Sequence, residues 1–299
     1  MQYDKWNDVL GVTRTHRIPR SSIAFFATDR IRYQHNDGCM YNAMGKGCKF
    51  CEFTSKYNSL KAITFNEDDI LEVIDSTKGE RQVSMQSSYG HSGLGFRHVL
   101  IGGGTLRNDI HSARDRIVKM ADKINPKDSD ERMPIYLMCV PPDDLDDLKV
   151  WHDHGITEVS FNMEVYSHMV AKEIMPGKSR ISRSTYISAL TQATQVWGRN
   201  GNVRSSLILG LESVDSTMDG VKMLSSLGVS PILSIFRPVR GTELEWVMPL
   251  SSPELYEIHQ RAAKQCKTMN IRLGPACIQC QNNTVVLPEG LEPREGARA

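Results

Sequence analysis

The 299-residue chain lacks long hydrophobic runs and a marked excess of charge of either sign. Its most apolar stretches, such as "SSLILGL" (205–211), are far too short to cross a bilayer. The formal net charge is +1, from 36 Lys and Arg against 35 Asp and Glu, and this balance favours neither nucleic acid nor an anionic membrane as a partner. The first 20 residues contain no apolar signal segment, so we expect a cytoplasmic protein.

Cysteine is also sparse, and its odd number of seven, in a chain without an export signal, argues against a disulfide framework. Cys39, Cys48 and Cys51 nevertheless lie together in "CMYNAMGKGCKFC" (39–51), and Cys277 and Cys280 form a Cys-x-x-Cys pair. Spacing alone leaves three interpretations open. The first is a zinc site, which would join the two Cys-x-x-Cys pairs and leave Cys39 without a role. The second is an iron–sulfur cluster, which would use the three clustered thiolates. The third interpretation is a disulfide.

Short apolar runs rich in β-forming residues alternate with amphipathic helical stretches along most of the chain. Six strand–helix units in a row predict a parallel sheet with helical crossovers, either an open doubly wound sheet or a barrel. The chemically suggestive residues fall at strand ends, which one shared barrel mouth explains better. The predicted strands are 21–28, 97–105, 134–140, 157–166, 202–211, 230–239 and a short 270–274, and the predicted helices are 66–79, 108–124, 142–155, 183–198, 215–228 and 252–269.

The cysteine segment resembles the cluster loop of the radical S-adenosylmethionine (radical SAM) superfamily. That loop follows the first barrel strand and ends in Cys-x-aromatic-Cys, here Cys48-Lys49-Phe50-Cys51. The first spacing is eight residues where most of the superfamily has three, so the motif is a variant Cx8CxxC. The resemblance implies that Cys39, Cys48 and Cys51 hold a [4Fe–4S] cluster whose open iron chelates S-adenosylmethionine (SAM).

The same resemblance implies the fold class and its boundaries. We expect an α/β protein with a partial (β/α)6 TIM-like barrel of the radical SAM type over residues 21–275. Residues 1–20 would form an N-terminal helical extension, and residues 276–299 a short C-terminal extension.

Other stretches resemble the superfamily's cofactor contacts. "IGGGT" (101–105) resembles its glycine motif, in which the missing Cβ lets backbone carbonyls approach the SAM amino group. In "SFNMEVYS" (160–167), alternation puts Asn162 and Glu164 on one face, and a buried Glu164 needs a partner such as the ligand or Arg183. For "IGGGT" the alternative is a plain tight turn, and for Arg183 it is a surface arginine. Arg180 is a second candidate for the role of Arg183. The implied SAM-binding residues are Phe50, Gly102, Gly103, Gly104, Thr105, Asn162, Glu164, Arg183 and Gly210.

Biotin synthase, a member with similar strand ends, suggests a second cluster. Cys139, at the end of a predicted strand, would join Cys277 and Cys280 as ligands of an auxiliary iron–sulfur cluster. The alternatives are a buried free thiol for Cys139, and a zinc site or a redox dithiol for the pair. Cys266 lies on a predicted amphipathic helix and is expected to be structural.

The resemblance implies reductive cleavage of SAM to a 5′-deoxyadenosyl radical that abstracts hydrogen from an unactivated carbon. We expect a biotin synthase- or lipoyl synthase-like sulfurtransferase, with an archaeal-type lipoyl synthase component as a specific case. Carbon-skeleton rearrangement or dehydrogenation, with the auxiliary cluster as substrate anchor or electron relay, is the alternative. A structural zinc protein is the alternative outside the superfamily.

The expected partners are a small-molecule or carrier-protein-bound acyl substrate, an electron donor of the flavodoxin or ferredoxin type, and a second radical SAM subunit. Arg237 and Arg240 are expected to bind a carboxylate or phosphate of the substrate, with surface pairing to nearby glutamates as the alternative. The long first spacing carries Tyr41, Asn42 and Met44, which we expect to lie over the cluster and contact the adenine.

Overall fold

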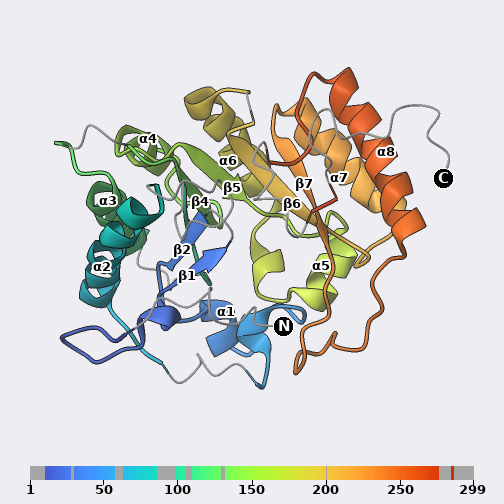
Figure 1. Ribbon diagram of the computed structural model, residues 1–299. Coiled ribbons are helices and arrows are strands. Elements are labelled where there is room, and N and C mark those ends of the chain that lie inside the picture. The colour runs from blue at the N-terminus through green and yellow to red at the C-terminus, as the bar shows by residue number, and fades with distance from the viewer. Residues whose placement is uncertain are drawn as a thin grey trace.

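A computed structural model describes residues 11–27, 30–57, 63–85, 98–105, 110–128, 132–199, 201–275 and 284–285 (Figure 1). Seven strands form a sheet in which each strand pairs with its neighbours in chain order. The strands are β1 (Ala24–Ala27), β2 (Arg30–Gln34), β3 (His98–Gly102), β4 (Ile135–Cys139), β5 (Glu158–Phe161), β6 (Val203–Leu209) and β7 (Ser230–Ile235).

Helices connect the strands and pack against their neighbours along the chain. The α-helices are α1 (Met40–Ala43), α2 (Glu67–Met85), α3 (Ile110–Ile124), α4 (Asp147–Asp153), α5 (His168–Ile174), α6 (Arg183–Trp197), α7 (Val214–Ser226) and α8 (Ser252–Thr268). Three short 3₁₀ helices are η1 (Arg20–Ser22), η2 (Glu52–Thr54) and η4 (Lys178–Arg180).

The strand order decides between the two predicted architectures. β2 to β7 are parallel throughout, and only β1 is antiparallel, to β2. A doubly wound sheet reverses its order at a switch point, whereas this order never reverses within the described strands. The α/β class and the partial barrel with six parallel strands are therefore confirmed, and every parallel strand ends at the same mouth.

The two faces of the barrel strands differ in chemistry. Outward residues such as Ile31, Val99 and Leu137 pack with helix residues such as Ile70 and Leu190 in the main hydrophobic core. Each of these five side chains is fully buried or nearly so. The inward positions carry many polar and charged residues, in the order Arg30, Arg32 and Gln34 on β2, Tyr136 on β4, Glu158 and Ser160 on β5, and Arg204 and Ser206 on β6.

The strand before the cysteine loop differs from the prediction. The strand predicted at 21–28 is only the first arm of a hairpin, and β2, its second arm, leads into the loop. Sequence inspection missed β2 because "RIRYQ" places Arg30 and Arg32 at inward positions, which breaks up the apolar run. The short strand predicted at 270–274 is also wrong, since those residues form no strand, and α5 was not predicted.

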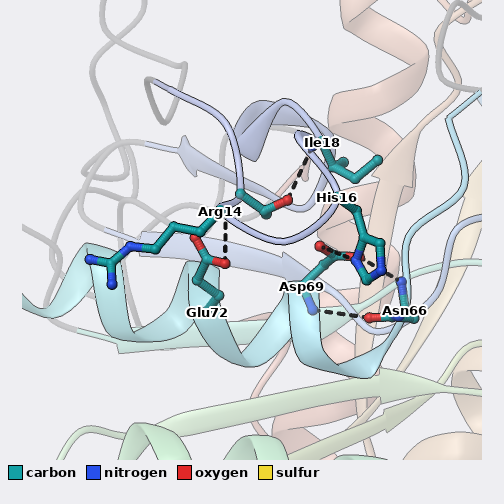
Figure 2. Close-up of polar contacts among 7 residues, drawn as sticks. Arg14, His16, Ile18, Asn66, Asp69 and Glu72 are labelled. Atoms are coloured by element: carbon teal, nitrogen blue, oxygen red, sulfur yellow. Dashed lines mark hydrogen bonds and ion pairs between the residues drawn. The ribbon is translucent and has the colours of Figure 1, made fainter.

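The helix predicted within residues 1–20 is not seen in residues 11–19, which form a turn closed by a bridge between Val12 and Pro19. Residues 1–10 lie outside the described part. The turn packs on the start of α2, where the Arg14 backbone N–H donates to Glu72 at 2.8 Å (Figure 2). His16 Nδ1 lies 3.1 Å from the Asp69 carboxylate.

The start of α2 has reciprocal hydrogen bonds between two side chains and the backbone. The Asp69 N–H donates to the Asn66 side-chain oxygen, and the Asn66 N–H donates to the Asp69 carboxylate, both at 3.1 Å. These bonds satisfy N–H groups that a helix start otherwise leaves free. Burial opposes the Asp69 charge, but the Asn66 N–H, Thr13 and His16 together lower the pKa of Asp69 below its usual value.

Asp69→Asn should lower the free energy of unfolding by about 1 kcal/mol at pH 7, because it removes the charge that accepts these bonds. A depressed folded-state pKa contributes stability that is present above the unfolded pKa of about 3.9 and is lost as the pH falls through the folded pKa. The difference between variant and wild type should therefore shrink below about pH 4 in urea unfolding followed by circular dichroism. The matched control is Asp68→Asn, at an exposed neighbouring position. A difference that does not change with pH would contradict the role of the charge.

Candidate active site

The cysteine loop begins directly after β2. Cys39 precedes α1, and Cys51 precedes η2, so short helical turns fix both ends of the motif. The Thr54 hydroxyl is close to the carbonyl oxygens of Cys48 and Cys51, at 2.9 and 2.6 Å. The Cys51 N–H also donates to the Cys48 carbonyl at 3.0 Å. The Cys-x-x-Cys half of the motif is thus a compact, hydrogen-bonded turn.

The other half of the motif packs on the glycine stretch after β3. The Met40 N–H donates to the Thr105 carbonyl at 2.8 Å. A Cβ on Gly104 would lie 2.5 Å from Cys39 Cβ and would overlap the Gly38 carbonyl oxygen. Only glycine allows the first cysteine to lie this close to the end of β3.

The loop also contacts the opposite side of the mouth. The Lys49 N–H donates to the Ile174 carbonyl at the end of α5, at 2.8 Å, and the Lys56 N–H donates to Gly241 beyond β7, at 3.0 Å. Phe50 packs with Cys48 against a small apolar cluster that includes Ile174. The cysteine loop therefore spans the mouth from β3 to the connection after β7.

The inserted residues between Cys39 and Cys48 form the single turn α1 and the bend after it. Tyr41 packs on Gly177, where a Cβ would lie 2.5 Å from its ring, and it lines the main cavity. The Asn42 amide donates to the Phe53 carbonyl at 2.7 Å, and Met44 is exposed. Of Tyr41, Asn42 and Met44, Tyr41 is the one that lines the cavity, and its predicted contact with adenine stays a prediction.

Glu164 and Lys178 form an ion pair beside the cysteines. Lys178 Nζ lies 2.8 Å from Glu164 Oε1, and the two side chains are 13% and 18% exposed. Burial opposes the charge on Lys178, but the Glu164 carboxylate overcomes it and raises the Lys178 pKa. Glu164 adopts a left-handed backbone with φ 68°, held by hydrogen bonds to the Ser206 carbonyl and from the Ile208 N–H. Such a backbone in a non-glycine residue is strained and is common at functional sites.

Burial favours the protonated form of three thiols of the site. Burial raises the pKa of Cys48 to about 12, against the nearby Lys178 ammonium, and burial likewise raises the pKa of Cys139 to about 12. Burial is also the largest cause that raises the Cys51 pKa, and the Cys39 thiol adds to it. A metal must displace these protons because the thiolate is the ligand.

The three clustered cysteines fit a [4Fe–4S] cluster by their chemistry. Cys39, Cys48 and Cys51 are partly exposed free thiols that lie within each other's electrostatic reach. Across the described ranges, no three His, Cys, Asp or Glu side chains are grouped to hold one metal ion. A [4Fe–4S] cluster does not require its cysteines to converge on one metal ion, because each thiolate binds a different iron.

A cavity of about 260 Å³ opens between the cysteine loop and the strand ends. It is lined by the end of β4, by the residues that follow β3 and β5, by α3 and α4, and by residues between η4 and the start of α6. The structure brings together these predicted site residues in its wall: Gly103, Gly104, Thr105, Cys139, Asn162 and Glu164. Asn162 is held in place by the Ser206 N–H, which donates to its side-chain oxygen at 3.0 Å.

Several predicted site residues lie outside this wall. Arg183 is exposed, stacks on Tyr166 at 4.1 Å and donates to its carbonyl. Arg237 and Arg240 are exposed beyond β7, and Arg240 stacks on Tyr57 at 4.8 Å. Phe50, Gly102 and Gly210 also do not line the cavity. The predicted ligand contacts of these residues stay predictions.

The predicted auxiliary ligands are only partly described. Cys139 lies in the cavity wall, while Cys277 and Cys280 lie outside the described residues. Cys266 is buried in α8, as expected of a structural residue. The auxiliary cluster stays a prediction.

Sequence inspection missed two residues of the site. Lys178, which was not predicted, is the basic residue that pairs with Glu164. Its position after the Pro–Gly turn in "MPGKSR" was the available signal. His35, directly after β2, lines the cavity with 3% exposure, and neither ring nitrogen has a partner among the described residues. Burial, with the cations of two nearby arginines, lowers the pKa of His35 to about 3, so the ring is neutral.

The described helices include none that is both long and apolar enough to cross a membrane.

Gly104→Ala should reduce iron incorporation and lower the unfolding midpoint, because the added methyl group overlaps the cysteine loop. Overpacking of this kind costs about 1–3 kcal/mol. The matched control is Gly38→Ala, since a Cβ there meets nothing within 4 Å. Iron content after anaerobic reconstitution and thermal unfolding measure the effect. Equal iron content in the two variants would show that the close packing at Gly104 is not needed.

Lys178→Met should destabilise the chain by about 3 kcal/mol, because it leaves the Glu164 carboxylate largely buried without its partner. The double variant Lys178→Met with Glu164→Gln should recover most of this loss, because no uncompensated charge remains. Urea unfolding of the three proteins at pH 7 measures the coupling. Additive losses in the double variant would contradict the pairing.

Comparison with known proteins gives two relatives and a fold. No protein-family model matches the chain. It is 24% identical over 245 residues to the bacteriochlorophyllide c C-7(1)-hydroxylase of Chlorobaculum limnaeum, covering 79% of this chain and 59% of that protein. It is 25% identical over 266 residues to the biotin synthase of Chlorobaculum tepidum, covering 80% of this chain and 70% of that protein.

The solved structure of a radical SAM methyltransferase from Sphaerobacter thermophilus has the same fold, with a TM-score of 0.57 at 13% identity. The match covers 84% of this chain and 67% of the methyltransferase. The chain thus spans less than two thirds of the length of the hydroxylase, and 70% of the length of the biotin synthase. Taken with the partial barrel and its cysteine loop, these similarities place the chain in the radical SAM superfamily.

Proposed function

We propose that the protein is an enzyme that cleaves SAM reductively and removes a hydrogen atom from an unactivated carbon of its substrate. The observation that carries this proposal is the position of the three-cysteine loop. It packs on Gly104 and lies beside the Lys178–Glu164 pair, at the edge of a cavity over the parallel strand ends.

Cys39, Cys48 and Cys51 would hold the [4Fe–4S] cluster. The cluster and SAM together supply one-electron cleavage of the sulfonium bond and removal of a hydrogen atom. Lys178 and Glu164 carry the charges that complement the carboxylate and the ammonium group of a bound amino acid. Because they already pair with each other, such a ligand exchanges one ion pair for two and leaves no buried charge alone.

Much of the rest of the cavity wall is apolar, and Tyr41 contributes to it from the cysteine loop. Apolar side chains around a reactive species limit its contact with solvent and strengthen the electrostatic contacts inside. The apolar lining residues are Met40, Ala113, Ile117, Met138, Val140, Pro141, Pro142, Trp151 and Ile181.

For the subsequent step we propose sulfur insertion. It is supported by the similarity to biotin synthase and by Cys139 in the cavity wall, which would join Cys277 and Cys280 around an auxiliary cluster. An acyl substrate, small or carrier-bound as for a lipoyl synthase component, suits the apolar wall. An electron donor of the flavodoxin or ferredoxin type and a second radical SAM subunit complete the proposed partners.

Hydroxylation is the second candidate for this step. The relative of 24% identity over 245 residues is a hydroxylase, and its similarity covers 79% of the chain. Both candidates share hydrogen removal from a carbon and differ in the atom that is added afterwards.

Cys48→Ala should abolish formation of 5′-deoxyadenosine, because the cluster loses one of its three protein ligands. Cys266→Ala, which removes a buried thiol far along the chain in α8, is the matched control and should retain it. Anaerobically reconstituted proteins, dithionite and SAM suffice, with chromatography of the nucleoside product. Cleavage by the Cys48 variant at the wild-type rate would refute the cluster assignment.

Cys277→Ala should retain SAM cleavage and stop product formation if an auxiliary cluster donates the sulfur. Mass spectrometry of candidate substrates after turnover distinguishes the two candidate reactions, since a gain of sulfur supports insertion and a gain of oxygen supports hydroxylation. Sulfur insertion at the full rate by the Cys277 variant would remove this residue from the ligand set.

A further inference from the structure

The barrel interior below the cavity is unlike the interior of most barrels. Barrel interiors are usually packed with branched apolar side chains. Here the strand registers align Arg32, Leu100, Tyr136 and Glu158 in one inward row. The next inward row, closer to the mouth, contains Gln34, Gly102, Met138, Ser160, Arg204 and Ser230.

The charges in these rows do not balance. Arg204 Nη1 pairs with Glu158 Oε2 at 2.8 Å, so this arginine is compensated. Arg30 and Arg32 have no hydrogen-bond or ion-pair partner for their side chains among the described residues. Both residues are partly exposed, but both Nε atoms are buried. The contact found for Arg32 is stacking on the Phe25 ring, at 5.2 Å.

A guanidinium group stays charged even when it is buried, so two arginines without an ion-pair partner among the described residues create a positive potential. Burial lowers the pKa of Arg32, and the neighbouring Arg30 adds to this effect, while Glu52 and Cys51 oppose it. Arg116 contributes a further cation nearby, since its guanidinium donates to the His35 carbonyl at 3.0 Å. The neutral state of His35 agrees with a local excess of positive charge.

Arg32 lies directly behind the wall of the cavity. A Cβ on Gly102 would be 3.8 Å from Arg32 Nε and 3.8 Å from Met138 Cβ, and Met138 lines the cavity. The side-chain oxygen of Gln34 is also buried without a partner, and it lies 3.3 Å from the Cβ position of Gly103. The absence of side chains on Gly102 and Gly103 thus keeps the wall thin between the cavity and the arginine.

We infer that Arg32, supported by Arg30, forms an anion-binding subsite inside the barrel that takes a carboxylate or phosphate group of the substrate. A guanidinium group that is partly withdrawn from water is costly without a counter-charge, and a ligand anion supplies one through charge-assisted hydrogen bonds. This inference rests on the proposed function for the identity of the ligand as substrate. It places the acidic group of the substrate below the cavity, away from the exposed Arg237 and Arg240.

Anion binding can be measured without the natural substrate. The anaerobically reconstituted full chain is titrated with inorganic phosphate, and separately with acetate, at constant ionic strength adjusted with sodium chloride. Isothermal titration calorimetry and the shift of the thermal unfolding midpoint are the readouts. The wild type should bind one of the two anions saturably, and the preferred anion identifies the acid. Non-saturating stabilisation alone is the general effect of phosphate on proteins and would overturn the inference.

Arg32→Gln should weaken the binding at least tenfold, as expected for the loss of one charge-assisted contact. Arg32→Lys should give an intermediate affinity, because it keeps the charge and loses the planar fork. The matched control is Arg132→Gln, at an exposed position before β4, which should bind as the wild type does. If Arg32→Gln does not fold by circular dichroism, the Lys variant and Arg30→Gln carry the same test.

Equal affinity in wild type and in the Arg32 variants would overturn the inference. Formation of 5′-deoxyadenosine by the same wild-type preparations separates this failure from that of the proposed function. Cleavage of SAM without anion binding refutes the subsite alone. Anion binding without cleavage refutes the proposed reaction and leaves the subsite in place.

Discussion

The close packing of Cys39 on Gly104 is the constraint on which the rest of the site depends. It brings a loop that follows β2 against the end of β3, at a distance that no side chain on Gly104 would permit. From there the loop crosses the mouth and is tied by backbone hydrogen bonds to the end of α5 and to Gly241 beyond β7. The three thiols, the ion pair and the cavity are therefore parts of one hydrogen-bonded assembly.

Much of the fold followed from the sequence, because alternating strands and helices have distinct periodicities. The barrel prediction succeeded because chemically suggestive residues fell at strand ends, which is a topological clue. β2 escaped notice for a physical reason, since its inward residues Arg30 and Arg32 are charged. The strict alternation in "RIRYQ" is a strand pattern, but it differs from the nearly continuous apolar run that marks most parallel strands, so a search for apolar runs passes over it.

The site residues that lie in short contiguous motifs could be predicted from the sequence. Those whose role depends on neighbours distant in the sequence could be predicted less well. The cysteines and the glycine stretch are contiguous segments, so the sequence displays them together. The partner of Glu164 is not contiguous with it, and residues 178–183 contain three basic side chains that spacing alone does not distinguish. Only the turn that precedes η4 points Lys178, instead of either arginine, toward the carboxylate.

The turn α1 has a consequence for how such motifs are recognised. Its first N–H is bonded to the Thr105 carbonyl, and the Lys46 N–H after it bonds back to the Tyr41 carbonyl at 2.7 Å. The residues between Cys39 and Cys48 thus fold back on themselves between these two backbone hydrogen bonds, which serve as anchors. The eight residues between the first two cysteines are thus accommodated while both anchors are retained. A search built on one fixed spacing would pass over chains of this kind, whereas one built on the anchors would find them.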